Sequence, residues 1–178
     1  MTGRYALFPT PIGTCAIVWG EAGVLGVHLP GADEPATRSG VLRRFGRADE
    51  AAPDAEIRAV IDAIGTLLAG GRDDLRRVRL DMRRIPDFNR RVYEHTRGIG
   101  PGETSSYGEL ARSLGDAGLA RAVGRSLGAN PYAIVVPCHR VLAAGGRAGG
   151  FSAPGGIDTK RRLLEIEQAR IGSGPSLF

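Results

Sequence analysis

The sequence predicts an α/β protein of the α+β type, in which a small N-terminal α/β domain precedes a mostly helical domain. Three observations support this class. Strand-like segments separated by turn signals occupy residues 4–30, an amphipathic helix follows at residues 55–71, and a helix-turn-helix pattern covers residues 106–128. The composition changes at RRIPDF, so we expect domains at 1–84 and 85–178, the second with a short C-terminal tail. One continuous domain is the alternative.

The composition is that of an ordinary globular protein, with 42% hydrophobic and 24% charged residues. No apolar run reaches the roughly 18 residues of a membrane span, and the first residues lack the order of a signal peptide. We therefore expect a cytoplasmic protein without a membrane partner. Cys15 and Cys138 form no CxxC pair and no Cys/His cluster, so no metal is expected. Cys15, in TCAIVWG, fits a buried strand thiol.

Charge is distributed unevenly along the chain. Residues 1–75 carry 7 Arg and 10 acidic residues, a net charge of −3, whereas residues 76–178 carry 17 basic and 9 acidic residues, a net charge of +8. A basic half beside an acidic half suggests that the basic half binds a polyanion. The alternative is a solvated basic surface without a partner.

The N-terminal elements are justified in order by their patterns. YALFPT, TCAIVWG and VLGVHLPG are strand-like and are separated by the turn signals PIG and EAG. A helix is possible at Thr37–Phe45. Residues 55–71 form an amphipathic helix that Gly70 and Gly71 end, and RVRLDM at residues 77–82 is a candidate strand. The apolar face of the amphipathic helix consists of Ile57, Val60, Ile61, Ile64, Leu67 and Leu68.

The second half begins with three expected helices. Asp87 can cap a helix whose apolar positions include Val92. Ser106 and Glu109 have the spacing of a capping box and open a short helix that ends at Gly115. A further helix covers residues 119–127 and ends at Gly128. Two short helices joined by a glycine-bearing turn indicate a helix-turn-helix, a pattern that many helical proteins also contain by chance.

The second helix of this pattern has features suited to nucleic acid. Arg121 and Arg125 stand four residues apart, opposite the apolar face, where an anion between them would offset their repulsion. Gly124 lies in mid-helix, and Ala122 and Ser126 flank the exposed face. Small residues and two arginines would let a helix approach a groove closely. An ordinary exposed helix with tolerated small residues is the alternative.

A possible catalytic centre lies in VVPCHRVL. Pro137 cannot donate a ladder hydrogen bond, so a strand at residues 132–136 should end there and place Cys138 at its terminus. Neighbouring strand residues point to opposite sides, so contact between Cys138 and His139 needs a bend or a bridging water. Such contact would lower the thiol pKa and populate the nucleophilic thiolate. A buried cysteine beside a satisfied core histidine is the alternative.

The last helix supplies a partner for the histidine. It is expected from about Asp158 to Arg170, with Asp158 or Thr159 as its N-cap. Glu167 falls on the apolar face, and Glu165 points away. A buried carboxylate needs a partner, which suggests Cys138, His139 and Glu167 as nucleophile, base and orienting group. The apolar face is defined by Leu163, Leu164 and Ile171.

These motifs together resemble a known family. SYGELA, ARAVG, GANP and VVPCHRVL, followed by GGFS and KRRLLEIE, lie between about Phe88 and Glu167 in the order found in the methylated-DNA–protein-cysteine methyltransferases, also called O6-alkylguanine-DNA alkyltransferases. The cysteine motif is highly specific. PTPIGTCAIVWGEAGVLGVHLPG resembles more loosely that family's ribonuclease-H-like N-terminal domain. The second domain would then be winged-helix-like.

The resemblance implies a function and a set of roles. An alkyl group would move irreversibly from O6-alkylguanine in double-stranded DNA to Cys138, once per protein molecule and without a cofactor. O4-alkylthymine is a further candidate substrate, and the protein would be a monomer that can cluster on DNA. His139 would activate the thiol through a water held by Glu167, and Asn130 would tie the helix-turn-helix to the cysteine strand. The residues implied for DNA and base binding are Tyr107, Arg121, Gly124, Arg125, Ser126, Val141, Phe151 and Ser152.

Within these roles, Arg121 would replace a flipped guanine, Tyr107 would help to rotate the nucleotide, and the second helix would enter the minor groove. The sequence departs from the family pattern at Phe151, where tyrosine is usual, and at Ala153-Pro154, which lengthens the pocket loop by about two residues. Three other functions were weighed: a non-catalytic protein that binds alkyl lesions, a cysteine hydrolase using Cys138 and His139, and a transcription regulator.

Overall fold

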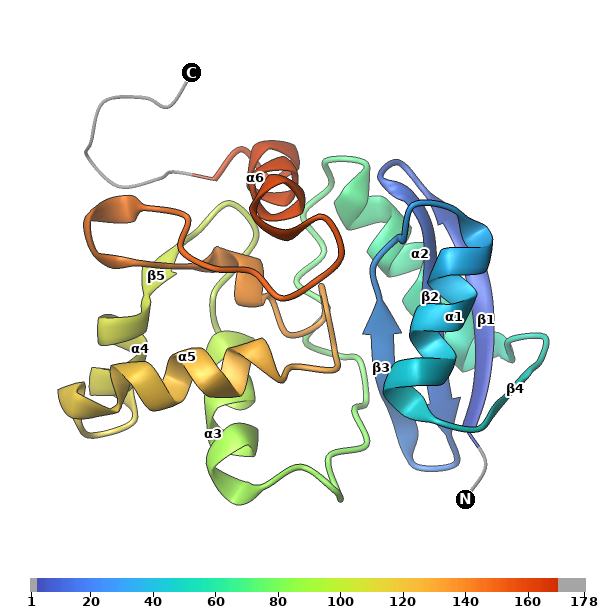
Figure 1. The fold of residues 1–178 in the computed structure, drawn as a ribbon, viewed down its shortest axis with the longest axis horizontal. Coiled ribbons are helices and arrows are strands. Elements are labelled where there is room, and N and C mark those ends of the chain that lie inside the picture. The colour runs from blue at the N-terminus through green and yellow to red at the C-terminus, as the bar shows by residue number, and fades with distance from the viewer. Residues whose placement is uncertain (1–2, 170–178) are drawn as a thin grey trace.

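The computed structural model describes residues 3–169, in which a sheet-containing half packs beside a helical half (Figure 1). The three expected N-terminal strands are present as β1 (Gly3–Thr10), β2 (Gly13–Gly20) and β3 (Gly23–His28). They pair antiparallel in the order β3-β2-β1, and a fourth strand, β4 (Ala48–Glu50), pairs parallel to β1. The sequence did not predict β4, which has three residues and no apolar alternation.

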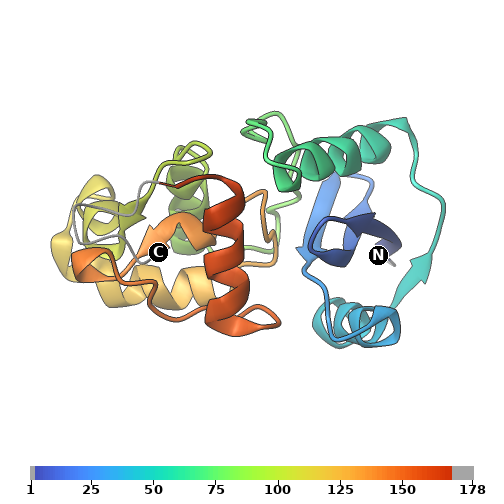
Figure 2. The same cartoon turned by 90° about the horizontal axis from the view of Figure 1, so that it is seen from above.

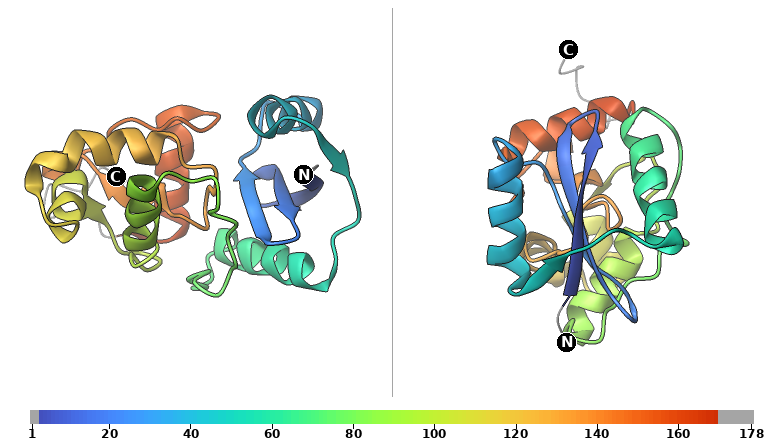
Figure 3. Two further views of the ribbon diagram at one scale, coloured as in Figure 1. Left: turned by 90° about the horizontal axis from the view of Figure 1, so that it is seen from below. Right: turned by 90° about the vertical axis from the view of Figure 1, so that its right-hand side faces the viewer.

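Two helices cover opposite faces of this sheet (Figure 2). Helix α1 (Glu34–Phe45) begins three residues before the predicted start, because Asp33 accepts a hydrogen bond from the backbone N–H of Ala36 and caps it. Helix α2 (Ala55–Leu68) has the predicted apolar face and is capped by Asp54. Seen along the sheet, α1 and α2 stand on either side of the strands (Figure 3, right).

The segment after α2 differs from the expectation. Residues 77–82 do not form a strand, and Leu80 makes only an isolated bridge to Val24 at the edge of the sheet. Arg97 explains part of this, because its guanidinium donates to the carbonyls of Leu75, Arg76 and Val78. Side-chain donors thus satisfy carbonyls that a neighbouring strand would otherwise satisfy.

The helical half contains α3 (Asp87–Thr96), α4 (Tyr107–Ser113) and α5 (Ala120–Gly128), with the short 3-10 helix η1 (Ala117–Leu119) before α5. The predicted capping box is confirmed: Ser106 Oγ accepts from the N–H of Glu109, whose side chain accepts from the N–H of Ser106. The expected cap by Asp87 is wrong. Pro86 occupies the N-cap position without a side-chain hydrogen bond, and Asp87 is the first helical residue.

The last helix also differs at both ends. Helix α6 (Gly156–Ile166) begins before Asp158, with Gly155 at its N-cap in a left-handed conformation at φ 77°. It ends at Ile166 rather than near Arg170, so Glu167 is its C-cap residue. Arg170 and Ile171, which the prediction included, lie outside the described residues.

The predicted strand at residues 132–136 is wrong, because this segment, which leads to Cys138, forms tight turns. Hydrogen bonds from Val135 N–H to Ala133 O and from Val136 N–H to Tyr132 O fold this segment into tight turns. Ile134 has a positive φ of 71°, which is rare for a β-branched residue. Three short elements follow: η2 (Cys138–Arg140), β6 (Val141–Leu142), which pairs parallel to β5 (Ser105–Ser106), and η3 (Ala144–Gly146).

One buried hydrophobic cluster runs through both halves. It includes Ile17, Trp19 and Ile64 of the first half together with Val123 and Val136 of the second. The two predicted domains therefore share packed side chains, and the boundary at residues 84/85 stays a prediction. None of the described helices is long and apolar enough to cross a membrane.

Candidate active site

Cys138 borders a cavity of about 350 Å³ in the helical half. Tyr107, the first residue of α4, lines it on one side, and Gly124 and Leu127 of α5 line it on another. Gly150, Phe151 and Ser152 contribute from the loop that precedes α6. The helix-turn-helix, the cysteine segment and the glycine-rich loop, which are separate in the sequence, thus meet around one space.

The turn at Pro137 separates the thiol from the imidazole. Pro137 has φ −79° and ψ 65°, and the N–H of Cys138 donates to Val136 O at 2.8 Å. The tight turn and the 3-10 helix η2 leave Cys138 half-buried while His139 is only 1% exposed. Within residues 3–169, no direct hydrogen bond joins Cys138 to His139. The two side chains are therefore not joined directly, and the bridging water stays a prediction.

His139 belongs to a fully buried polar network. Its Nε2 lies 2.8 Å from Oε1 of Glu167, as the helical periodicity predicted. Arg140 donates to both carboxylate oxygens of Glu167, from Nε and Nη2 at 2.8 Å each, and from Nη1 to Ile99 O at 2.6 Å. The N–H of Gly102 donates to Oε2 of Glu167 at 3.3 Å. The carboxylate is thereby held by four hydrogen bonds, and its position is fixed.

The network sets the charges of its members. Burial acts to raise the pKa of Glu167, but hydrogen bonds from His139 and Arg140 outweigh it and lower that pKa to about 2. Burial lowers the pKa of His139, although Glu167 acts in the opposite direction. The carboxylate is therefore ionised at neutral pH, and the imidazole is held neutral and able to accept a proton.

The thiol is held mainly in its protonated form. Burial raises the pKa of Cys138, against the smaller opposing effects of Asn130, Lys160 and Arg44. His139 makes no direct hydrogen bond to the sulfur, so the expected lowering of this pKa through a bridging water stays a prediction. A base is therefore needed to form the thiolate.

Asn130 connects the end of α5 to the cysteine segment. Its Nδ2 donates to Val136 O at 2.9 Å, and its Oδ1 accepts from the N–H of Tyr132 at 2.9 Å. Asn130 is 7% exposed, so both ends of its amide are paired in a desolvated environment. The expected link between the helix-turn-helix and the cysteine segment is present in this geometry, although the linked segment is a turn and not a strand.

Sequence reasoning missed Arg140 and Lys160. Lys160 of α6 is completely buried, and its Nζ donates to Val141 O at 2.6 Å and lies 5.9 Å from the ring centroid of Tyr107. Burial lowers its pKa to about 8. Helical periodicity carried the available signal, because Lys160 precedes Leu164 by four residues on the buried face. Arg140, placed between Pro137 and Val141, gave no such signal.

The expected base-binding residues differ in their surroundings. Tyr107 is half-buried with its ring near Gly124 and Gly149, and burial raises its pKa. Phe151 is half-buried against the cavity, and the Ser152 hydroxyl donates to Gly128 O at 2.9 Å. Val141 is buried, and Lys160 already occupies its carbonyl.

The expected DNA-facing residues of α5 divide into two groups. Arg121 and Arg125 are exposed, and Gly124 lies at the cavity. The expectation that Ser126 flanks the exposed face is wrong: its side chain is buried, and its hydroxyl has no partner among the described residues. The backbone carbonyl of Ser126 accepts from Tyr93 Oη of α3 at 3.0 Å. A direct DNA contact by this hydroxyl is therefore not available.

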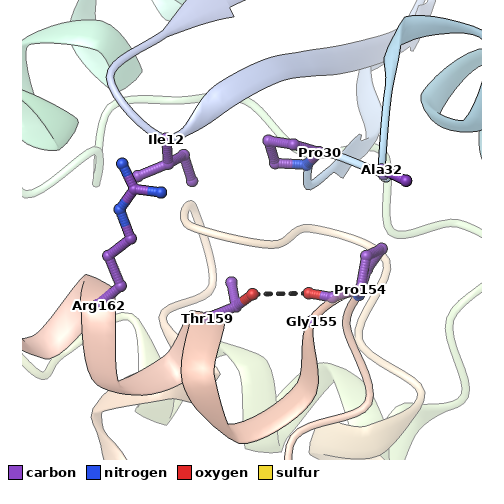
Figure 4. A pocket seen from close by; sticks show the side chains of 8 residues that line it. Ile12, Pro30, Ala32, Pro154, Gly155, Thr159 and Arg162 are labelled. Atoms are coloured by element: carbon purple, nitrogen blue, oxygen red, sulfur yellow. Dashed lines mark hydrogen bonds between the residues drawn. The ribbon is translucent and has the colours of Figure 1, made fainter.

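A larger cavity of about 410 Å³ lies between the two halves and away from Cys138 (Figure 4). Ile12, Pro30 and Ala32 line it from the sheet side, and Thr159 and Arg162 line it from α6. Thr159 donates to Pro154 O and Arg162 donates to Pro11 O, so both polar side chains are paired within the protein. This cavity lacks a nucleophile, and its size does not make it the reactive site.

Comparison with known proteins gives a consistent result. Residues 87–169 match the family model described as "6-O-methylguanine DNA methyltransferase, DNA binding domain". A methylated-DNA–protein-cysteine methyltransferase of Mycobacterium bovis is 50% identical over 101 residues, which are 57% of this chain and 59% of that protein. The matched residues therefore span about three fifths of the length of that relative.

Other comparisons cover more of both partners. A methylated-DNA–protein-cysteine methyltransferase of Methanothermobacter thermautotrophicus is 32% identical over 157 residues, covering 88% of this chain and 81% of that protein. The crystal structure of Mycobacterium tuberculosis OGT in complex with DNA has a TM-score of 0.72 and 34% identity, covering 93% of this chain and 92% of that one. The likeness extends through both halves of the fold.

Proposed function

Since the chain belongs to the methylated-DNA–protein-cysteine methyltransferase family, we propose that it repairs DNA by transferring an alkyl group from O6 of guanine to Cys138. The observation that carries this proposal is the position of Cys138. Its thiol borders a cavity of about 350 Å³ that α5, the helix with two exposed arginines, also lines. The adjacent residue His139 belongs to a buried network with Glu167 and Arg140.

The chemical step follows from the nature of the groups. A proton passes from Cys138 to His139, and the thiolate attacks the alkyl carbon attached to O6. The carbon–oxygen bond breaks, its electron pair stays on guanine, and the base takes up a proton. A thioether remains on the protein, and no general base in the site can remove the alkyl group from the sulfur. Each molecule therefore acts once and needs no cofactor.

The proton route uses the unpaired atom of His139. Ionised Glu167 can only accept a hydrogen bond, so the neutral ring carries its proton on Nε2 and donates it to Oε1. Nδ1 is then an acceptor. Nδ1 is buried without a partner among the described residues. A single water between Nδ1 and the Cys138 sulfur would satisfy both atoms and carry the proton. Tyr107, at the cavity wall, would donate to the departing base.

Access to O6 requires that the nucleotide leaves the duplex. Enzymes that act on a base extrude it from the stack and bind it in a pocket. Helix α5 would lie in the minor groove of double-stranded DNA, with Gly124 allowing close approach. Arg121 would fill the space left by the guanine, and Arg125 would contact phosphate. Phe151 and Ser152 would border the base. The protein would bind as a monomer that can cluster on DNA, and O4-alkylthymine would be a second substrate.

The direct test is to incubate the protein with duplex DNA containing O6-methylguanine and to map the methyl group by peptide mass. We expect one methyl group per protein molecule, on Cys138. Release of more than one equivalent of product from an ester or amide would instead support a cysteine hydrolase. Lesion binding without any mass gain would support a non-catalytic binding protein.

A further inference from the structure

The turn after α5 is held by the N-terminal half of the chain. Three consecutive carbonyls of this turn accept hydrogen bonds from that half. Arg44, in the last turn of α1, donates from Nη2 to Ala129 O at 3.2 Å and to Asn130 O at 2.7 Å. The N–H of Val27 in β3 donates to Pro131 O at 2.9 Å. The backbone on either side of Asn130 is thus fixed from the sheet side.

The same turn positions the nucleophile. The Asn130 amide donates to Val136 O, which also accepts from the N–H of Cys138. Arg44, Asn130 and Cys138 line one narrow crevice of about 30 Å³ behind the glycine-rich loop. Asn130 therefore links Arg44, which binds its backbone carbonyl, to the segment that carries the thiol, which its side chain binds.

Arg44 also places a positive charge at the C-terminal end of α5. The C-terminal end of a helix carries partial negative charge on its free carbonyls, and α5 ends beside Cys138. Such charge disfavours a thiolate, and the guanidinium of Arg44, which donates to the carbonyl of the C-cap residue Ala129, offsets it. Besides Arg44, the ionisable groups around Cys138 are His28 of β3, in the same crevice, Lys160 of α6, Tyr107 of α4, Tyr93 of α3 and the adjacent His139. The positive charges of Lys160 and Arg44 both act to lower the pKa of Cys138 and so favour the thiolate.

We propose that Arg44 is a positioning residue for Cys138, through which the N-terminal half braces the Asn130 turn and places positive charge behind the sulfur. The proposal rests on the assignment of Cys138 as the nucleophile in the proposed function. Arg44 does not touch the alkyl group or the base. It acts through Asn130 and through the field at the end of α5. The N-terminal half then helps to position the reactive thiol, in addition to packing against the helical half.

The test measures the thiol itself and does not depend on DNA. Iodoacetamide modification of Cys138 is followed by peptide mass from pH 5 to pH 10 in the wild-type protein and in Arg44→Gln and Arg44→Lys. Arg43→Ala is the matched control, because Arg43 is the neighbouring exposed arginine on α1. Methyl transfer from O6-methylguanine DNA is measured on the same samples.

We expect Arg44→Gln to react about two- to fivefold more slowly at pH 7, as for a charge at an exposed helix end, and to reach the wild-type rate at high pH. Arg44→Lys should fall between Arg44→Gln and wild type, and Arg43→Ala should match wild type. An unchanged profile, or an equal loss at every pH in both Arg44 variants, would overturn the proposal. A shifted thiol profile without methyl transfer in the wild-type protein would support the role of Arg44 and remove the proposed function.

Discussion

Nε2 of His139 lies 2.8 Å from Oε1 of Glu167, and the same carboxylate accepts two further hydrogen bonds from Arg140. Arginine does not lose its proton in proteins, so Glu167 stays ionised even when His139 is neutral. The fixed anion therefore orients the imidazole. Nδ1 is left as a buried acceptor without a partner among the described residues.

Cys138→Ser should abolish alkyl transfer and leave DNA affinity within a few-fold of wild type. A hydroxyl is a far weaker nucleophile than a thiolate, whereas binding depends on α5. Peptide mass after incubation with O6-methylguanine DNA gives the first result, and fluorescence anisotropy gives the second. Cys15→Ser serves as the control, because Cys15 is fully buried in β2 and burial raises its pKa to about 12. A methyl group on Cys15 would contradict the assignment.

Glu167→Gln should slow transfer and shift thiol reactivity to higher pH, whereas exposed Glu165→Gln should change neither. Glutamine removes the anion that orients His139 and supports it as a base. It also leaves Arg140 without its buried counter-charge, so we expect a loss of about 3–5 kcal/mol of stability in urea unfolding. The pH profile is compared only where both variants are folded. Equal profiles for the two variants would remove Glu167 from the mechanism.

Stability should fall in acid as Glu167 becomes protonated. Its pKa in the folded protein is about 2, below the ordinary value of 4.5, so its contribution is fully present above pH 4.5 and is lost as pH falls through 2. A shift of this size corresponds to about 3 kcal/mol. Urea unfolding between pH 6 and pH 2 should show the difference between wild type and Glu167→Gln shrinking in that window. A constant difference would show that other groups cause the acid sensitivity.

Arg121→Ala should strongly slow repair of duplex DNA and leave the reaction with free O6-benzylguanine nearly unchanged. If Arg121 replaces the extruded guanine, its loss affects only a base that must leave the stack, and unstacking costs a few kcal/mol. Single-turnover rates with the two substrates, at one salt concentration, measure this directly.

Arg125→Ala is the control for simple charge attraction. Its loss should weaken binding to all DNA sequences, lower the salt slope by about 1, and leave the rate at saturating DNA nearly intact. If Arg121→Ala lost both activities in proportion, the residue would support the fold or the pocket and not base extrusion.

Ser126→Ala should leave DNA binding within twofold of wild type and should not destabilise the protein. The Ser126 hydroxyl is buried and unpaired among the described residues, so its removal relieves a desolvation cost of about 1–3 kcal/mol. Anisotropy with duplex DNA and urea unfolding test the two parts. A tenfold loss of affinity with unchanged stability would mean that this side chain reaches DNA after all.

Local signals predicted the elements whose partners are close in sequence. The three N-terminal strands, α2 and the Ser106–Glu109 capping box depend on alternation, amphipathicity and a three-residue spacing, and the structure confirms them. The same helical periodicity placed Glu167 against His139 across a distance of 28 residues, because a buried carboxylate and a buried imidazole need each other.

The failures have a common cause in contacts that periodicity along the chain does not show. Residues 132–136 have the composition of a strand, but Asn130 and local turns satisfy their polar groups. In residues 77–82, which form no strand, the guanidinium of Arg97 occupies the carbonyl of Val78. Ser126 was placed at the exposed face because helical angles alone do not show which side of a helix its neighbours cover. No local pattern encodes such contacts.

The burial of Lys160 has a consequence for the chemistry of the surface. It is the only lysine in the sequence, and it is completely enclosed. Every exposed cationic side chain of the described fold other than histidine is thus an arginine, whose charge persists at any ordinary pH. Enzymatic acetylation of lysine cannot erase the positive charge that α5 presents, and amine-reactive dyes or cross-linkers find no lysine to label on the folded molecule. The affinity of this surface for polyanions can be adjusted by salt, but not by acylation.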